Sequence, residues 1–124
     1  MTVVDSSGWI EFLQGTGRAA LFESALARLD GVIVPSVTLF EVHRLIATNA
    51  SETAADAALT LMQKARVMDL DATLARLASA VARAHHLALA DSIIYATARH
   101  CGAELWTQDA HFKDLPGVRY FPKP

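Results

Sequence analysis

Four acidic residues are spaced so that a single sheet could bring their carboxylates together. Asp5 follows the apolar run Thr2–Val4, Asp109 lies just beyond a second apolar run, and Glu41 and Asp91 lie in segments with helical periodicity. Four carboxylates in one pocket raise one another's pKa values and repel unless a cation is present. Mg²⁺ and Mn²⁺ prefer such oxygen ligands, and two ions can hold both reacting oxygens of a phosphodiester. The four acids therefore predict a catalytic site for one or two divalent cations.

Each of these acids also has an ordinary structural interpretation. Asp5 and Asp109 could cap a helix or a turn, and Asp91 could interact with a helix dipole. Glu41 is harder to explain in this way, because it interrupts an apolar helix flank between Val37 and Leu45. Only the combination of the four positions favours a site over four separate structural roles.

The elements that must position these acids alternate along the chain. Apolar runs bounded by turn residues predict strands over Thr2–Val4, Val32–Val34, Val67–Leu70, Ala103–Trp106 and Val118–Phe121. Apolar residues at three- and four-residue steps predict helices over about 6–13 (capped by Ser6 or Ser7), 18–29, 37–49, 51–65, 71–84 and 91–101.

Strands that alternate with helices favour one particular architecture. We expect a single domain over residues 1–124, an α/β fold in which a central, mainly parallel sheet lies inside a three-layer α/β/α sandwich. Ligands of such sheets bind beyond the carboxyl ends of the strands, where Asp5 and Asp109 are expected.

Composition narrows the class of protein. The 124 residues suffice for one domain, and the only cysteine, Cys101, cannot pair within the chain. The start of the chain lacks the pattern of a signal peptide, and no apolar run approaches the roughly 20 residues that span a bilayer. We expect a cytoplasmic protein without a membrane segment.

The charge balance gives only weak information about partners. The chain has 11 Lys and Arg residues against 13 Asp and Glu, so its net charge is −2. Without the four suspected site acids the balance is 11 against 9, a slightly basic surface that suits a phosphodiester substrate.

Four short motifs resemble one known family. They are V-V-D-S-S at the start, P-S-x-x-x-x-E-V around Glu41, L-A-D-S-x-I-x-A-T-A from Leu89 to Ala98, and L-x-T-x-D-x-x-F from Leu105 to Phe112. Their order and spacing resemble the PIN-domain ribonucleases, specifically the VapC-type toxins of toxin–antitoxin pairs. The resemblance spans nearly the whole chain.

The resemblance implies a function. Asp5, Glu41, Asp91 and Asp109 would be the metal-binding acids, and Ser6 and Thr107 would support the site. The chain would be an endoribonuclease dependent on Mg²⁺ or Mn²⁺ that cleaves RNA such as tRNA or rRNA. It would also form a homodimer and bind a small antitoxin protein.

Two further residues are candidates for contact with the substrate. Some relatives have an extra acid two residues after the last motif aspartate, where this chain has His111. We expect His111 to face solvent or contact a phosphate, since Mg²⁺ prefers oxygen ligands. Arg44, three residues after Glu41, could face the same cleft or lie at an ordinary surface position.

Other chemistries fit less well. His85 and His86 lack the partners of a zinc site, and the phosphate-binding loops and the nucleophile elbow are absent. The aromatic residues Trp9, Phe12, Phe40 and Trp106 are interpreted as core or dimer contacts rather than base-stacking platforms.

Two alternatives to the ribonuclease stay open at this stage. One is a PIN-like RNA-binding or regulatory module that does not cleave. The other is a phosphotransfer receiver domain, although the single Asp5 and the terminal Lys123 do not supply its paired acids and its lysine.

Overall fold

A five-stranded parallel sheet forms the centre of the molecule. The computed structural model describes residues 1–124. The strands are β1 (Thr2–Val4), β2 (Val32–Pro35), β3 (Arg66–Met68), β4 (Glu104–Thr107) and β5 (Val118–Tyr120). They lie in the order β3-β2-β1-β4-β5, and each neighbouring pair is parallel. The strand β1 is thus the central one. Receiver domains have the strand order 2-1-3-4-5, so this sheet excludes the phosphotransfer receiver domain as an alternative.

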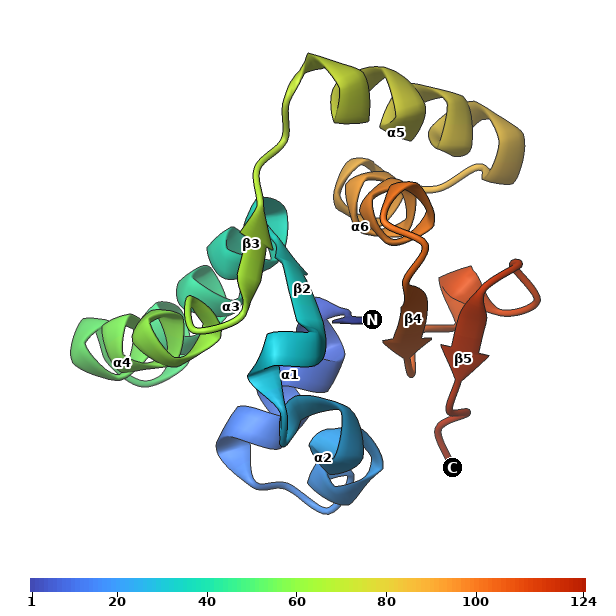
Figure 1. Ribbon diagram of the computed structural model, residues 1–124. Helices are drawn as coiled ribbons and strands as arrows, with labels where there is room; N and C mark the ends of the chain where they lie inside the picture. The colour runs from blue at the N-terminus through green and yellow to red at the C-terminus, as the bar shows by residue number, and fades with distance from the viewer.

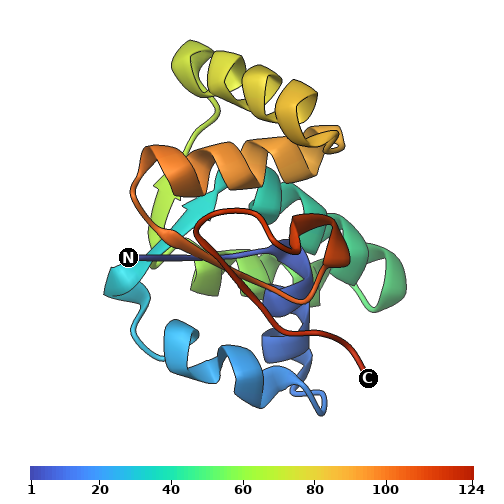
Figure 2. The same ribbon diagram turned by 90° about the vertical axis from the view of Figure 1, so that its right-hand side faces the viewer.

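Helices cover both faces of this sheet, which confirms the predicted α/β/α sandwich. They are α1 (Ser6–Gln14), α2 (Ala19–Leu26), α3 (Ser36–Asn49), α4 (Glu52–Met62), α5 (Ala72–His85) and α6 (Leu89–His100), with short 3₁₀ turns at η1 (Leu29–Gly31) and η2 (Ala110–Phe112). In Figure 1, α5 and α6 lie on one side and α1 and α2 on the other, while α3 and α4 flank the β2–β3 edge. Figure 2 shows α5 stacked outside α6.

Alternating side chains of the strands build the two halves of the core. Val4 of β1 and Val32 and Val34 of β2 pack with helices α1 to α4, around Trp9 and Phe22. Their neighbours, Val3 and Ile33, pack instead with α6 around Ile94 and Tyr95. This alternation is the period of two that a strand imposes, and here both faces are buried.

The predicted boundaries of α2, α4 and α6 and the predicted cap of α1 differ from the structure, in which α4 ends at Met62 and α6 begins at Leu89. The helix predicted over residues 18–29 ends at Leu26, and the chain then forms the 3₁₀ turn η1. Neither Ser6 nor Ser7 caps α1, because both lie within the helix; Asp5 is the cap, and its Oδ1 accepts from the Gly8 amide at 2.9 Å. Ser51 caps α4 and Asp71 caps α5.

Gly8 allows α1 to begin close to the sheet. A Cβ atom at this position would lie 2.6 Å from Val4 Cγ1 and 2.8 Å from the ring of Phe22. Glycine therefore lets the first turn of α1 pack directly on β1, which holds the Gly8 amide against Asp5.

None of the helices is both long and apolar enough to cross a membrane.

Candidate metal centre

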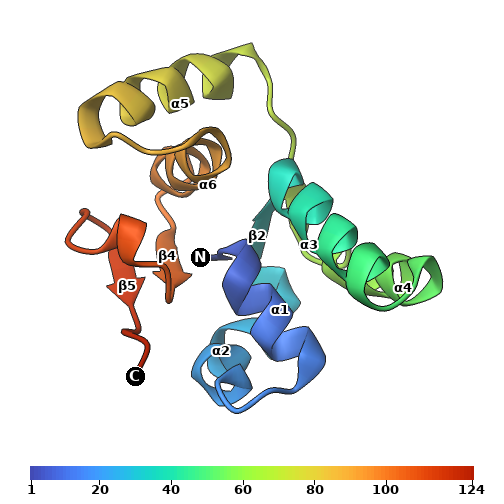
Figure 3. The same cartoon turned by 180° about the vertical axis from the view of Figure 1, so that it is seen from behind.

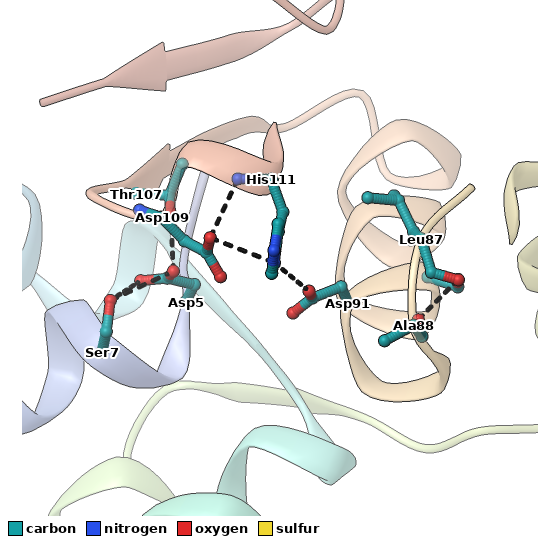
Figure 4. Close-up of polar contacts among 9 residues, drawn as sticks. Asp5, Ser7, Leu87, Ala88, Asp91, Thr107, Asp109 and His111 are labelled. Carbon is teal, nitrogen blue, oxygen red and sulfur yellow. Dashed lines mark hydrogen bonds and ion pairs between the residues drawn. The ribbon is translucent and has the colours of Figure 1, made fainter. Parts of the chain in front are cut away.

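Asp5 is a buried carboxylate held by several donors. It directly follows the central strand β1, and its side chain is nearly inaccessible, with 4% exposure. The Thr107 hydroxyl donates to Oδ2 at 2.5 Å, and the Ser7 hydroxyl lies 3.1 and 3.2 Å from the two oxygens (Figure 4). The Gly8 amide donates to Oδ1. A carboxylate offers about four lone-pair sites, so these three donors leave room for a further contact.

The register of two strands brings Asp5 close to Asp109. Val4 of β1 is paired with Trp106 of β4, so the residues that follow, Asp5 and Thr107, are neighbours at the carboxyl edge. The Thr107 hydroxyl also accepts from the Asp109 amide at 2.9 Å. Thr107 therefore supports two acids at once, consistent with its predicted role.

Asp91 faces Asp109 from the start of α6. This helix begins at Leu89, two residues before the predicted start, so Asp91 lies in its first turn. A helix N-terminus carries a partial positive charge that favours a carboxylate there. Asp109 caps η2, where its Oδ1 accepts from the His111 amide at 2.9 Å.

His111 lies between these two carboxylates. Its Nδ1 is 3.4 Å from Asp91 Oδ2 and 3.3 Å from Asp109 Oδ1, and Figure 4 shows the ring directed toward both. The His111 side chain as a whole is 73% exposed. His111 thus faces solvent, as expected, while η2 turns its Nδ1 toward the two acids, a contact that the sequence did not predict.

Glu41 reaches the same edge from α3. This helix starts immediately after β2, and the Ser6 hydroxyl donates to Glu41 Oε1 at 2.5 Å. Ser6, which the resemblance implied as a supporting residue, thus contacts Glu41. Glu41 is not among the three residues whose ligand atoms lie within 4.8 Å of one another, which are Asp91, Asp109 and His111.

Electrostatic effects link all four acids. Burial raises the pKa of Asp5 from 3.8 to about 6, against the hydrogen bonds from Thr107, Gly8 and Ser7, and the negative charge of Asp109 raises it further. Burial also raises the pKa of Asp91, to which the charges of Asp109 and Glu41 add, while His111 opposes the increase. The edge of the sheet therefore concentrates negative charge that its own residues only partly neutralise.

The donor set at this edge fits a divalent cation. Three ligand atoms, from Asp91, Asp109 and His111, lie within 4.8 Å of one another. Carboxylate oxygens suit Mg²⁺ and Mn²⁺, and the imidazole nitrogen is better suited to a transition metal than to Mg²⁺. Asp5 and Glu41 flank this group and would add negative charge toward the same ion.

Several contributors to the site were not singled out from the sequence. Ser7 was considered only as a cap, yet its hydroxyl holds Asp5. Gln108 is buried and accepts from Arg18 Nε at 2.5 Å, which fixes the loop after β4. Ser7 lies inside the V-V-D-S-S motif and could have been found there, whereas the contact of Arg18 with Gln108, 90 positions apart, has no local sequence signal.

The sequence profile of one family, described as the PIN domain, matches residues 2–118. The chain belongs to the PIN domain family. The fold and the order of the four acids agree with this assignment. No curated protein matches the chain with significant similarity.

Solved structures support the PIN fold over the full length of the chain. VapC20 of Mycobacterium tuberculosis, described as a sarcin-ricin loop cleaving toxin, is 23% identical with a TM-score of 0.81, covering 98% of this chain and 100% of that one. A toxin–antitoxin complex from Klebsiella pneumoniae contains a chain that is 23% identical, with a TM-score of 0.79 and 96% of each chain covered. The DNA-bound VapBC of Salmonella typhimurium is 17% identical, with a TM-score of 0.74 and coverage of 97% and 96%. At these identities the likeness concerns the fold.

Proposed function

We propose that this PIN domain is a metal-dependent endoribonuclease that acts as the toxin of a toxin–antitoxin pair. The proposal is supported above all by the electrostatic coupling of the four acids at the carboxyl edge of the sheet: the charge of Asp109 acts on both Asp5 and Asp91, and the charge of Glu41 acts on Asp91. A protein that only needed helix caps would not gather four acids that repel one another.

Each side chain has a definite task in the proposed reaction. Asp91 and Asp109 would hold the cation most directly, and Asp5 and Glu41 would complete its negative surroundings. Once bound, Mg²⁺ or Mn²⁺ supplies activation of water and stabilisation of the charge that develops on the phosphate. Thr107 and Ser7 fix the orientation of Asp5, and Ser6 fixes that of Glu41. Such supporting contacts to metal ligands typically contribute 10- to 100-fold in affinity or activity.

The proposed partners follow from the same family. We propose RNA as the substrate, a structured RNA such as tRNA or rRNA included, a small antitoxin as the protein partner, and a homodimer as the assembly. The Mycobacterium relative is described as cleaving the sarcin-ricin loop, and the Klebsiella relative as part of a toxin–antitoxin complex. These descriptions support, at the level of the family, an RNA substrate and an antitoxin for this chain.

The proposal predicts that removal of divalent cations stops RNA cleavage. Total tRNA and rRNA fragments are incubated with the purified protein in Mg²⁺, in Mn²⁺ and in excess EDTA, and products are resolved on denaturing gels. We expect cleavage with either metal and none in EDTA, with recovery after metal is restored. RNA binding without cleavage under all conditions would instead favour the non-cleaving PIN-like module, and cleavage in EDTA would contradict the metal site.

His111 offers a second prediction, on the choice of metal. Exchange of His111 for Asp adds an oxygen ligand and a negative charge beside Asp91 and Asp109, so we expect Mg²⁺ to bind about 10-fold more tightly. Titration calorimetry with Mg²⁺ and Mn²⁺ on wild-type protein and the variant measures this change. We also expect the preference for Mn²⁺ over Mg²⁺ to decrease, since the imidazole nitrogen favours Mn²⁺.

A matched control separates ligand position from charge. Ala110 is exposed and adjacent to His111, so Ala110→Asp adds the same charge without the same direct approach to Asp91. Ala110→Asp should change Mg²⁺ affinity much less than His111→Asp. Equal effects of the two substitutions would show that position 111 acts only through charge.

A further inference from the structure

An open groove lies beside the acidic centre, on the side of α1 and α3. Its volume is about 460 Å³, within the range of pockets that bind small ligands. Glu41 lines one part of it, together with Ser6, which donates to Glu41, and Ser7, which donates to Asp5. The groove is therefore continuous with the site at which we propose phosphodiester cleavage. Figure 3 shows α1 and α3 from behind.

Phe40 is an exposed aromatic residue on the wall of this groove. It lies one position before Glu41 on α3, and 62% of its surface is accessible. This exposure excludes the core position that was one of its two predicted roles; the other, a dimer contact, stays a prediction. The Arg44 guanidinium lies 5.9 Å from the centre of the Phe40 ring, within the range of a cation–π contact. No carboxylate lies within ion-pair distance of Arg44. An exposed ring beside an unpaired cation is the combination with which proteins stack bases and bind phosphates.

The lining of the groove favours a nucleotide over an apolar peptide. Seven of its ten residues are polar or charged, including Arg44 and Lys123, and only Ile10, Phe40 and Leu45 are apolar. A second groove, beside Leu13, Ile46 and Leu61, is lined by seven hydrophobic residues of nine and is better suited to apolar side chains. The polar groove also adjoins the acids, whereas none of the four acids lines the apolar one.

We propose that this groove binds single-stranded RNA, with Phe40 as a stacking platform for the base next to the cleaved bond and Arg44 and Lys123 as phosphate contacts. The proposal rests on the proposed ribonuclease function for the position of that bond. Since purines stack more strongly than pyrimidines, Phe40 would make a purine the preferred base at this position. Phe40 would thus be a specificity-determining residue, separate from the metal ligands.

Binding in EDTA tests the proposal without any cleavage. The probes are fluorescein-labelled oligoadenylate and oligouridylate of about eight nucleotides, a length typical of single-strand sites. We expect Phe40→Ala to weaken oligoadenylate binding about 5- to 100-fold, and Phe40→Trp to preserve it. The indole introduced at position 40 should lose fluorescence when oligoadenylate binds. Arg44→Ala should lower the slope of log affinity against log salt by about 0.7, the contribution of one phosphate contact to a single strand.

Leu77→Ala is the matched control, because Leu77 is an exposed apolar residue of α5 that does not line the groove. It should leave oligoadenylate affinity unchanged, and circular dichroism should show that all variants are folded. Unchanged affinity of Phe40→Ala would overturn the proposal. So would a change confined to self-association in sedimentation velocity, since Phe40 would then contact a second copy of the chain.

The two proposals fail in distinguishable ways. If wild-type protein cleaves RNA in Mg²⁺ while Phe40→Ala binds oligoadenylate normally, the groove proposal alone is wrong. If no metal supports cleavage but Phe40→Ala still loses affinity, the nuclease proposal is wrong and the groove is confirmed as an RNA site.

Discussion

Replacement of Asp5 or Asp91 by Asn is expected to abolish RNA cleavage and growth inhibition while the protein stays folded. Each exchange removes a negative charge from the proposed metal centre but preserves the size of the side chain. Loss of one group that stabilises developing charge typically costs about 100- to 1000-fold in rate. An asparagine at position 5 can still accept from the Gly8 amide, so α1 keeps its cap. Cleavage of labelled RNA in Mg²⁺, together with growth of an expressing strain, measures the effect.

Asp71→Asn provides the matched control for Asp5→Asn. Asp71 caps α5 and accepts from the Leu74 amide at 2.9 Å, the same local contact that Asp5 makes with Gly8. Asp71 has no part in the acidic centre, so Asp71→Asn should cleave RNA at the wild-type rate. Full activity of Asp5→Asn or Asp91→Asn would remove the proposed mechanism, and loss of activity in Asp71→Asn would mean that cap exchange alone disturbs the protein.

Asp5→Asn is also expected to stabilise the metal-free protein at neutral pH. The pKa of Asp5 is raised from 3.8 to about 6, mainly by burial, so folding favours the protonated carboxyl. The charged carboxylate therefore destabilises the fold at pH 7, by up to about 3 kcal/mol for a rise of this size. Neutral asparagine removes that penalty. Urea unfolding in EDTA, followed by circular dichroism, compares the two proteins.

The direction of the pH dependence follows from the sign of this shift. The stability associated with Asp5 is fully present below about pH 4, where the carboxyl is protonated in both states, and decreases as pH rises to about 6. The advantage of Asp5→Asn should therefore increase over this interval and then level off. Addition of saturating Mg²⁺ should reduce the advantage at pH 7, because a bound cation stabilises the carboxylate. A constant difference between the two proteins across the pH range would contradict the raised pKa.

Much of the architecture could be predicted from local patterns. The five predicted strands are present within one or two residues, because short apolar runs bounded by Gly, Pro and Asp have few alternatives to a buried strand. The N-cap of α1 could not be predicted, because three adjacent residues can each cap a helix. Ser6, Ser7 and Asp5 all have capping side chains, and in the structure Asp5 is the one that accepts from the Gly8 amide.

His111 and Phe40 show where sequence patterns fail. Local sequence patterns do not determine where the side chain of a residue on a 3₁₀ turn points. They therefore could not predict that His111 Nδ1 lies between Asp91 and Asp109. Phe40 has the hydrophobicity of a core residue, yet the position of α3 at the edge of the sheet leaves it 62% exposed in a groove.

The sequence by itself determined the elements and the parallel α/β class and predicted four acids as candidates for one site, because these inferences depend on patterns of residues close in the chain. The tertiary structure alone decided which acids form the closest group, what holds each carboxylate and which groove adjoins them. Those features depend on strand order, register and the directions of side chains that are up to 102 positions apart, as in the Thr107–Asp5 hydrogen bond. Local periodicity carries no information about such pairs.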